Sequence, residues 1–242
     1  MAREAAGQRA MASDARPDSD DLDALVQRVD PDRWLSSRFI ADAHERADVI
    51  ALYAYDHELA RAPRVASNPL LGEIRLTWWR EALDEIFEGR AVRRHPTAQA
   101  LAGVVGRRGL AREPLEAMID ARYRELDAEP LSEAEALEWA RETAGRAAQA
   151  AVVVLDPTAQ ADQAIAAPAA WALARRVAER PELRGAYQHL LAEGRRGAAQ
   201  LSAGAFPAVA HAVFADARAR GASTAGLGSR LRITLAVARG RI

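Results

Sequence analysis

The sequence contains no lysine, so all 33 of its basic residues are arginines. That absence excludes a Schiff-base lysine and a phosphate-binding P-loop lysine. Cysteine is also absent from the 242 residues, which excludes a thiol nucleophile, a disulfide framework and a thiolate metal site. The heavy use of alanine and arginine beside the missing lysine is typical of a GC-rich genome and indicates no function of its own.

Excess charge is lacking as well. The 33 basic and 34 acidic residues give a formal net charge of -1, so no long-range field gathers nucleic acid, and we expect no nucleic-acid partner. A run of about 18 apolar residues, which a membrane-spanning helix needs, is missing. Residues 1–20 have no apolar centre of a secretory signal. We therefore expect a cytoplasmic protein, with peripheral contact to the inner membrane left open.

Strand signals are almost absent, since the only β-branched run lies at residues 151–155 and continues an alanine-rich segment of helical character. Proline and glycine divide the chain into about nine helices. Short loops favour antiparallel packing of consecutive helices. We predict an all-α fold with a disordered tail at residues 1–20 and a single helical domain at residues 21–242.

The stretch "YAYDHELARAPR" lies at the end of a helix predicted over residues 42–61. Its Asp56 falls on the apolar stripe that Val49, Leu52 and Leu59 mark at helical spacing. A carboxylate in that position is costly unless it is paired or hydrogen-bonded. Two alternatives remain open: Asp56 belongs to a functional site, or it forms a salt bridge with an arginine.

The next helix, predicted over residues 71–88, is apolar on nearly every side. Such a pattern is typical of a helix in the middle of a bundle, and we predict that Trp78 or Trp79 is buried. Arg75 and Trp79 are four residues apart, so the guanidinium can lie over the indole. Arg75 would project from this buried helix close to Asp56, and this arrangement indicates a pocket or an ion pair in the core.

These residues carry a family resemblance. The segments "ALYAYDHELAR" and "VASNPLLGEIRLTWWREALDEIFEGR" resemble the squalene/phytoene synthase family, and "HPTAQALAGVVGRRGL" and "PLEAMIDARYRELD" are similar to the parts that follow. The resemblance implies a helical bundle of the isoprenoid-synthase type that joins two prenyl diphosphates. It also implies two aspartate-rich helices that hold magnesium, which makes diphosphate a leaving group.

The aspartate motifs of the family are not conserved in this sequence. Ala60, Arg61 and Arg64 occupy the positions where the first motif has aspartates. Asp56 and Glu58 remain, but they point about 200° apart around the helix and cannot chelate one ion together. In the region of the second motif, Glu179 and Glu182 flank Pro181, which breaks the helix that would present them. We therefore predict no catalytic residue and no metal site.

This combination resembles a divergent branch of the family that includes a mitochondrial assembly factor for respiratory complex I. The resemblance implies a non-catalytic pseudo-synthase that acts as a binding or assembly factor, without a cofactor and with a protein or an isoprenoid lipid as its partner. The alternative is an active prenyl transferase that condenses isoprenyl diphosphates with magnesium. Retained magnesium ligands or detectable turnover would favour the alternative.

A remnant of the substrate pocket is the predicted site. We expect it to contain Tyr55, Asp56, Arg75, Trp79 and Glu125. Glu125 matches a family position at the cavity mouth, although acids and arginines three or four residues apart, as in "IDARYRELD", are typical of surface pairs. Arg61 or Arg64 should lie at the mouth and pair with Glu45, Asp84 or Glu125, because a buried unpaired arginine is too costly.

The C-terminal segment Arg230 to Ile242 alternates apolar residues with arginines and contains no acid. A short basic amphipathic segment of this kind can lie on an anionic membrane or dock on a partner. It can also cap the bundle with its apolar side. The sequence leaves these alternatives open.

Overall fold

A computed structural model describes residues 17–64 and 68–242. Most of the tail predicted for residues 1–20 lies outside the described residues, and the first helix begins at Pro17. The helices are α1 (Pro17–Val29), α2 (Pro31–Ser37), α3 (Ala43–Arg64), α4 (Pro69–Phe87), α5 (Pro96–Arg108), α6 (Arg112–Tyr123), α7 (Glu133–Ala140), α8 (Arg146–Leu155), α9 (Ala166–Val177), α10 (Arg184–Ala198), α11 (Ala215–Ala219) and α12 (Leu227–Arg239). No strand occurs in this part of the chain, which confirms the all-α prediction.

The number of helices predicted from proline and glycine was too low. Short helices such as α2 and α11 carry too little apolar periodicity to be recognised. Helix boundaries with a local chemical signal were recovered better. Ser132 is followed three residues later by Glu135, the sequence signal of a capping box, and the two residues form one at the start of α7. The segment that follows is helical through the β-branched run, with one π turn at Arg141–Gly145 between α7 and α8.

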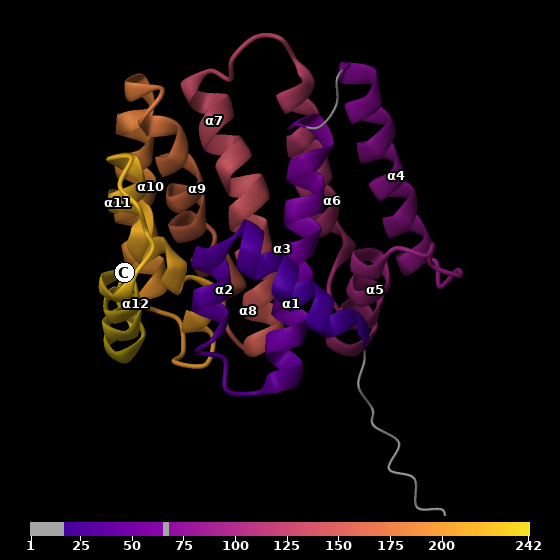
Figure 1. Ribbon diagram of the computed structural model, residues 1–242, viewed down its shortest axis with the longest axis horizontal. Helices are drawn as coiled ribbons and strands as arrows, with labels where there is room; N and C mark the ends of the chain where they lie inside the picture. Colours follow the sequence, from indigo (N-terminus) through magenta and orange to yellow (C-terminus); the bar gives the residue numbers. More distant parts are fainter. Residues whose placement is uncertain (1–16, 65–67) are drawn as a thin grey trace, which may run out of the picture.

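Helix α3 is central to the bundle (Figure 1), where it packs against α1, α4, α5, α6 and α8. Its inner residues are almost completely buried, including Tyr53, Tyr55 and Leu59. A second group forms around α9, which packs against α7, α10 and α11. The space between α3 and α9 brings together residues that are far apart in the sequence.

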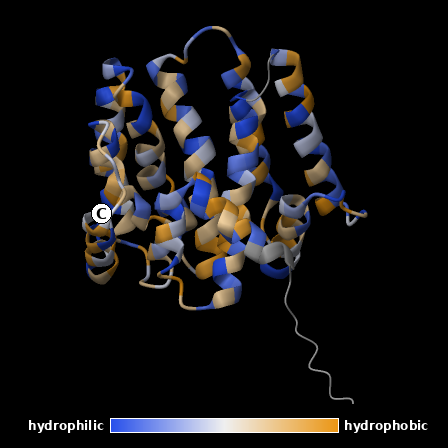
Figure 2. Cartoon of the chain, viewed as in Figure 1, coloured by the Kyte–Doolittle hydropathy of each residue, from blue (hydrophilic) through white to orange (hydrophobic). Residues whose placement is uncertain are grey.

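Helix α4 lies at one side of the bundle, not in its middle (Figure 1). Trp79 is buried, with 4% of its surface exposed, as predicted, whereas Leu70, Leu71 and Ile74 are exposed. The prediction of a central helix was wrong because an apolar pattern records which side chains could be buried, not how many helices surround them. Figure 2 shows hydrophobic residues on the outer part of this helix.

Among the described residues, no helix combines the length and the apolarity needed to cross a membrane.

Candidate functional site

A cavity of about 350 Å³ opens between α2, α3, α6, the π turn after α7, and α9. Its size is near the lower end of the range for small-molecule sites, roughly 300–1,000 Å³. Five arginines and three carboxylates line it, an excess of two positive charges: Arg33, Arg64, Arg122, Arg175, Arg176, Asp30, Asp56 and Glu179. The cavity is therefore suited to an anion.

Asp56 is the centre of a buried ion-pair network at the floor of this cavity. Arg33 Nη1 donates to Asp56 Oδ2 at 2.6 Å, and Arg122 Nη2 donates to Asp56 Oδ1 at 2.8 Å. All three residues are at most 6% exposed. Of the two alternatives that the sequence left open, the internal salt bridge is therefore confirmed, with two arginines in place of one.

The ionisation of the network follows from its geometry. Burial alone would raise the pKa of Asp56, but the charges and hydrogen bonds of Arg33 and Arg122 lower it to about 2. Burial would lower the pKa of each arginine, and Asp56 reverses that effect, so both pKa values lie above the usual value. Asp56 is thus an ionised partner of two cations across the physiological pH range.

Arg33 was not predicted from the sequence. It lies in the short helix α2, in which Asp30 is the N-cap residue, and it has no periodic neighbours that would indicate burial. Its guanidinium lies between two rings, 5.1 Å from the centroid of Tyr53 and 5.0 Å from that of Trp171. Its Nε and Nη2 atoms are buried without a hydrogen-bond partner. The two π faces compensate in part for those missing partners.

Glu125 lies beside the network rather than on the cavity wall. It accepts a hydrogen bond from Arg122 Nη1 at 2.6 Å and one from Trp139 Nε1 at 2.8 Å. The expectation that the acids and arginines of this segment form only surface pairs was wrong for Arg122, which is 3% exposed. It holds for Arg124, whose partner Asp127 is largely exposed.

Three arginines form the outer part of the cavity: Arg64, Arg175 and Arg176. Arg176 lies 4.0 Å above the Trp139 ring and 3.5 Å from Glu125. Arg64 and Arg175 form no ion pair with the side chains described at residues 21–64 and 68–242. Partial burial and the repulsion of neighbouring cations, Arg218 and Arg64 among them, lower the pKa of Arg175. This group of like charges lacks a full set of counterions.

Arg64 lines the cavity, as predicted, and Arg61 borders a separate groove, but neither has the partners that we predicted from the sequence. Arg61 pairs with Glu58 on its own helix at 3.0 Å. The three proposed acids pair elsewhere: Glu45 with Arg108, Asp84 with Arg112, and Glu125 with Arg122. The expectation failed because α5 and α6 supply nearer arginines, and their positions cannot be read from the spacing within α3.

Tyr55, Arg75 and Trp79 do not line the cavity around Asp56. Trp79 and Arg75 border a separate groove of about 340 Å³ between α3, α4 and His95. Tyr55 is buried between the helices, with its hydroxyl donating to the Leu115 carbonyl at 2.9 Å and its ring 5.3 Å from that of Trp79. Arg75 is exposed, and the guanidinium that stacks in this region is that of Arg93, over Trp78. The predicted site residues are therefore divided between two places.

The residues of the cavity do not fit the magnesium that the family resemblance implies. Magnesium binds through oxygen ligands in near-octahedral geometry. Both oxygens of Asp56 accept hydrogen bonds from arginines, and the two guanidinium cations beside it would repel a divalent ion. Among the side chains described at residues 21–64 and 68–242, no three histidines or carboxylates are grouped so that they could hold a metal ion.

Comparison with known proteins agrees with the architecture. At the level of sequence, the chain is 29% identical over 103 residues to NADH dehydrogenase (ubiquinone) complex I, assembly factor 6, of Bos taurus. The aligned part covers 43% of this chain and 30% of the length of that relative.

Two crystal structures share the fold. Squalene synthase HpnC from Alicyclobacillus acidocaldarius superposes with a TM-score of 0.66 at 16% identity, over 93% of this chain and 95% of that one. A dehydrosqualene synthase in complex with ligand gives 0.69 at 13% identity, over 92% and 96%. The sequence profile of squalene/phytoene synthase matches residues 26–178, more than half of the chain. The chain therefore belongs to the squalene/phytoene synthase family.

Proposed function

We propose that this chain is a non-catalytic member of its family, a binding or assembly module whose cavity accepts an anionic group directly through arginines. The observation that carries the proposal is the position of Asp56. Its two carboxylate oxygens are held by Arg33 and Arg122 at 2.6 and 2.8 Å. The two guanidinium cations that neutralise this carboxylate repel a divalent metal ion, so Asp56 is poorly suited to bridge such an ion and a departing diphosphate.

The three outer arginines indicate which chemical class of ligand the cavity would bind. Arg64, Arg175 and Arg176 supply planar groups of N–H donors without a full set of acid partners in the described residues. Arginine forms two parallel hydrogen bonds with phosphate or carboxylate groups, so these side chains favour such an anion. They supply hydrogen bonds and charge, but not the metal ions that assist departure of a diphosphate. The cavity thus supports binding better than turnover.

An assembly role is supported by the name of the bovine relative, a complex I assembly factor. We propose a corresponding role in the assembly of an NADH:quinone oxidoreductase, with the protein partner or isoprenoid lipid docking on a module near the inner membrane. Deleting the gene and measuring the amount of assembled enzyme by native gel electrophoresis tests this part. A deletion strain with a full amount of assembled, active enzyme would refute it.

Loss of catalysis is tested by incubating the pure protein with farnesyl diphosphate and magnesium and analysing the products by mass spectrometry. We expect unchanged substrate. Formation of squalene or of a cyclopropyl diphosphate would refute the non-catalytic proposal and restore the alternative, an active prenyl transferase. The shared fold of the two synthase structures makes that alternative worth the experiment.

A further inference from the structure

Helix α12 presents two apolar faces, and only one of them is packed. Ile233 and Ala236 are buried against the bundle, with 0% and 4% of their surface exposed. Leu227, Leu231 and Leu235 are 81%, 62% and 39% exposed. The helix therefore caps the bundle with one side, as one of the two C-terminal alternatives predicted, and leaves a leucine stripe exposed on the other.

The arginines of α12 flank this stripe on both sides. At 100° per residue the three leucines span about 80° of the helix surface. Arg232 and Arg239 follow Leu235 at about 40–60° on one side, and Arg230 precedes Leu227 by about 60° on the other. No acidic residue occurs between Leu227 and Ile242. The exposed face is thus a leucine centre with a cationic border.

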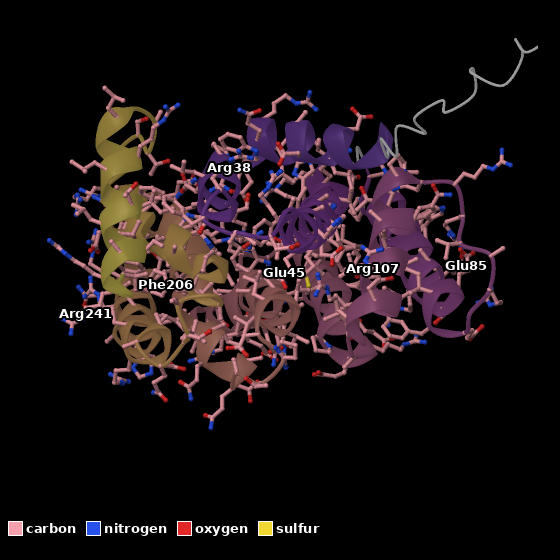
Figure 3. The ribbon with its side chains drawn as sticks, turned by 90° about the horizontal axis from the view of Figure 1, so that it is seen from below. Arg38, Glu45, Glu85, Arg107, Phe206 and Arg241 are labelled. Atoms are coloured by element: carbon pink, nitrogen blue, oxygen red, sulfur yellow. The ribbon has the colours of Figure 1, made fainter. Side chains whose placement is uncertain are left out.

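The position of α12 leaves this face accessible. The helix lies at the outer edge of the bundle beside the C-terminus (Figure 1). In the view from below, Arg241 lies at the end of the molecule opposite Glu85 of α4 (Figure 3). The cavity around Asp56 is lined by none of the residues of α12. A ligand on the leucine stripe would therefore occupy a site distinct from the cavity.

We propose that the exposed face of α12 binds an anionic lipid surface, with its leucines in the acyl boundary and its arginines at the headgroup phosphates. An interfacial helix has this arrangement, since long arginine side chains can extend from an apolar centre to the headgroups on both sides. Charge complementarity decides between the possible occupants. Three arginines without an acid would repel a second copy of the same face, whereas an anionic bilayer attracts each of them.

Co-sedimentation of the full chain with lipid vesicles tests this proposal. We expect binding to vesicles of equal parts phosphatidylcholine and phosphatidylglycerol, and little binding to phosphatidylcholine alone. Added salt should weaken the binding because it screens the arginines. Replacing Leu227, Leu231 and Leu235 together by serine should weaken it by at least ~10-fold, since most of the apolar insertion is lost. Circular dichroism should be unchanged, because these side chains are exposed.

Helix α4 offers a matched control. Its exposed residues Leu70, Leu71 and Ile74 form a second apolar patch without an arginine border on both sides. Their replacement by serine should leave vesicle binding within about twofold. The proposal is overturned if the α4 variant loses binding while the α12 variant keeps it, or if phosphatidylcholine alone binds as tightly. Self-association of the chain through α12 without vesicle binding would overturn it as well.

Discussion

At the scale of single residues, the cavity depends on one buried carboxylate that has a structural role. Asp56 lies on α3, and two arginines from α2 and α6 surround it. Removing one partner of a buried ion pair leaves an uncompensated charge in a low-dielectric environment. The aspartate should therefore be required for folding rather than for turnover.

The variant Asp56→Asn should lower the free energy of unfolding by about 3–5 kcal/mol, because Arg33 and Arg122 would lose their shared counterion. Chemical denaturation followed by circular dichroism measures this change. Glu58→Gln is the matched control on the same helix, since Glu58 pairs with the half-exposed Arg61; its effect should stay within about 1 kcal/mol. Equal effects of the two variants would contradict the ion-pair account.

Acid should weaken the same network. The pKa of Asp56 is lowered from 3.8 to about 2 by the two arginines, against the effect of burial. Its contribution to stability is therefore complete above about pH 4 and is lost as the pH falls through about 2, a change of roughly 2 kcal/mol. The difference in unfolding free energy between the wild type and Asp56→Asn should shrink over this range. A difference that stays constant down to pH 2 would show that Asp56 is not the titrating group.

The sequence revealed the unusual residue but not its partners. Asp56 is recognisable because a carboxylate on an apolar stripe violates a local pattern. Arg33 lies 23 positions away and Arg122 lies 66 positions away, and no local pattern connects residues at such distances. Arg175 and Arg176 lie on α9, and only the packing of the whole bundle places them at the cavity. The buried carboxylate was therefore predictable from a local pattern, whereas the arginines that other helices contribute to the site were not.

At the scale of helices, the contact between α9 and α10 depends on a glycine. A Cβ atom at Gly194 would lie 2.5 Å from the Ala167 Cα and 2.6 Å from its backbone nitrogen. Both are backbone atoms of α9, so they cannot move aside without shifting the helix. This close approach fixes α9, and with it Arg175 and Arg176 at the mouth of the cavity.

Gly194→Ala should therefore destabilise the protein by about 1–3 kcal/mol, the usual cost of overpacking. Gly185→Ala in the same helix is the control, because its added Cβ would meet only the Glu133 side chain at 3.5 Å. It should be neutral or stabilising by up to ~1 kcal/mol, since alanine favours the helix. Thermal unfolding compares the two variants, and a Gly194→Ala protein as stable as Gly185→Ala would argue against a tight crossing.

The π turn at Arg141–Gly145 is another feature of this scale. Insertions of this type are often found at functional sites, and here Thr143 and Ala144 from the turn line the cavity. The sequence indicated an alanine-rich segment of helical character through this region, without an interruption. A π turn shifts the phase of the apolar pattern by about one residue, and in an alanine-rich segment, where alanine fits a buried or an exposed position, that shift is not visible.

At the scale of the whole molecule, the helical bundle was predictable because its signals are local. Apolar periodicity, breaking residues and the family segments within residues 38–127 all indicated one all-α domain. The placement of α4 at the edge and the division of the predicted site between two cavities depend on how helices pack. Those features require three-dimensional information that spacing along one helix does not contain.

The central claim is that the cavity binds an anion through arginines and not through magnesium. Calorimetric titration with inorganic pyrophosphate in the presence of EDTA tests it most directly. We expect binding without metal, weakened by at least ~10-fold in the variant Arg175→Gln/Arg176→Gln because two charge-assisted donors are lost. The control, Arg195→Gln/Arg196→Gln, removes a consecutive pair of arginines from α10 outside the cavity and should bind like the wild type. Binding that requires magnesium, or that is equally affected by both double variants, would contradict the account.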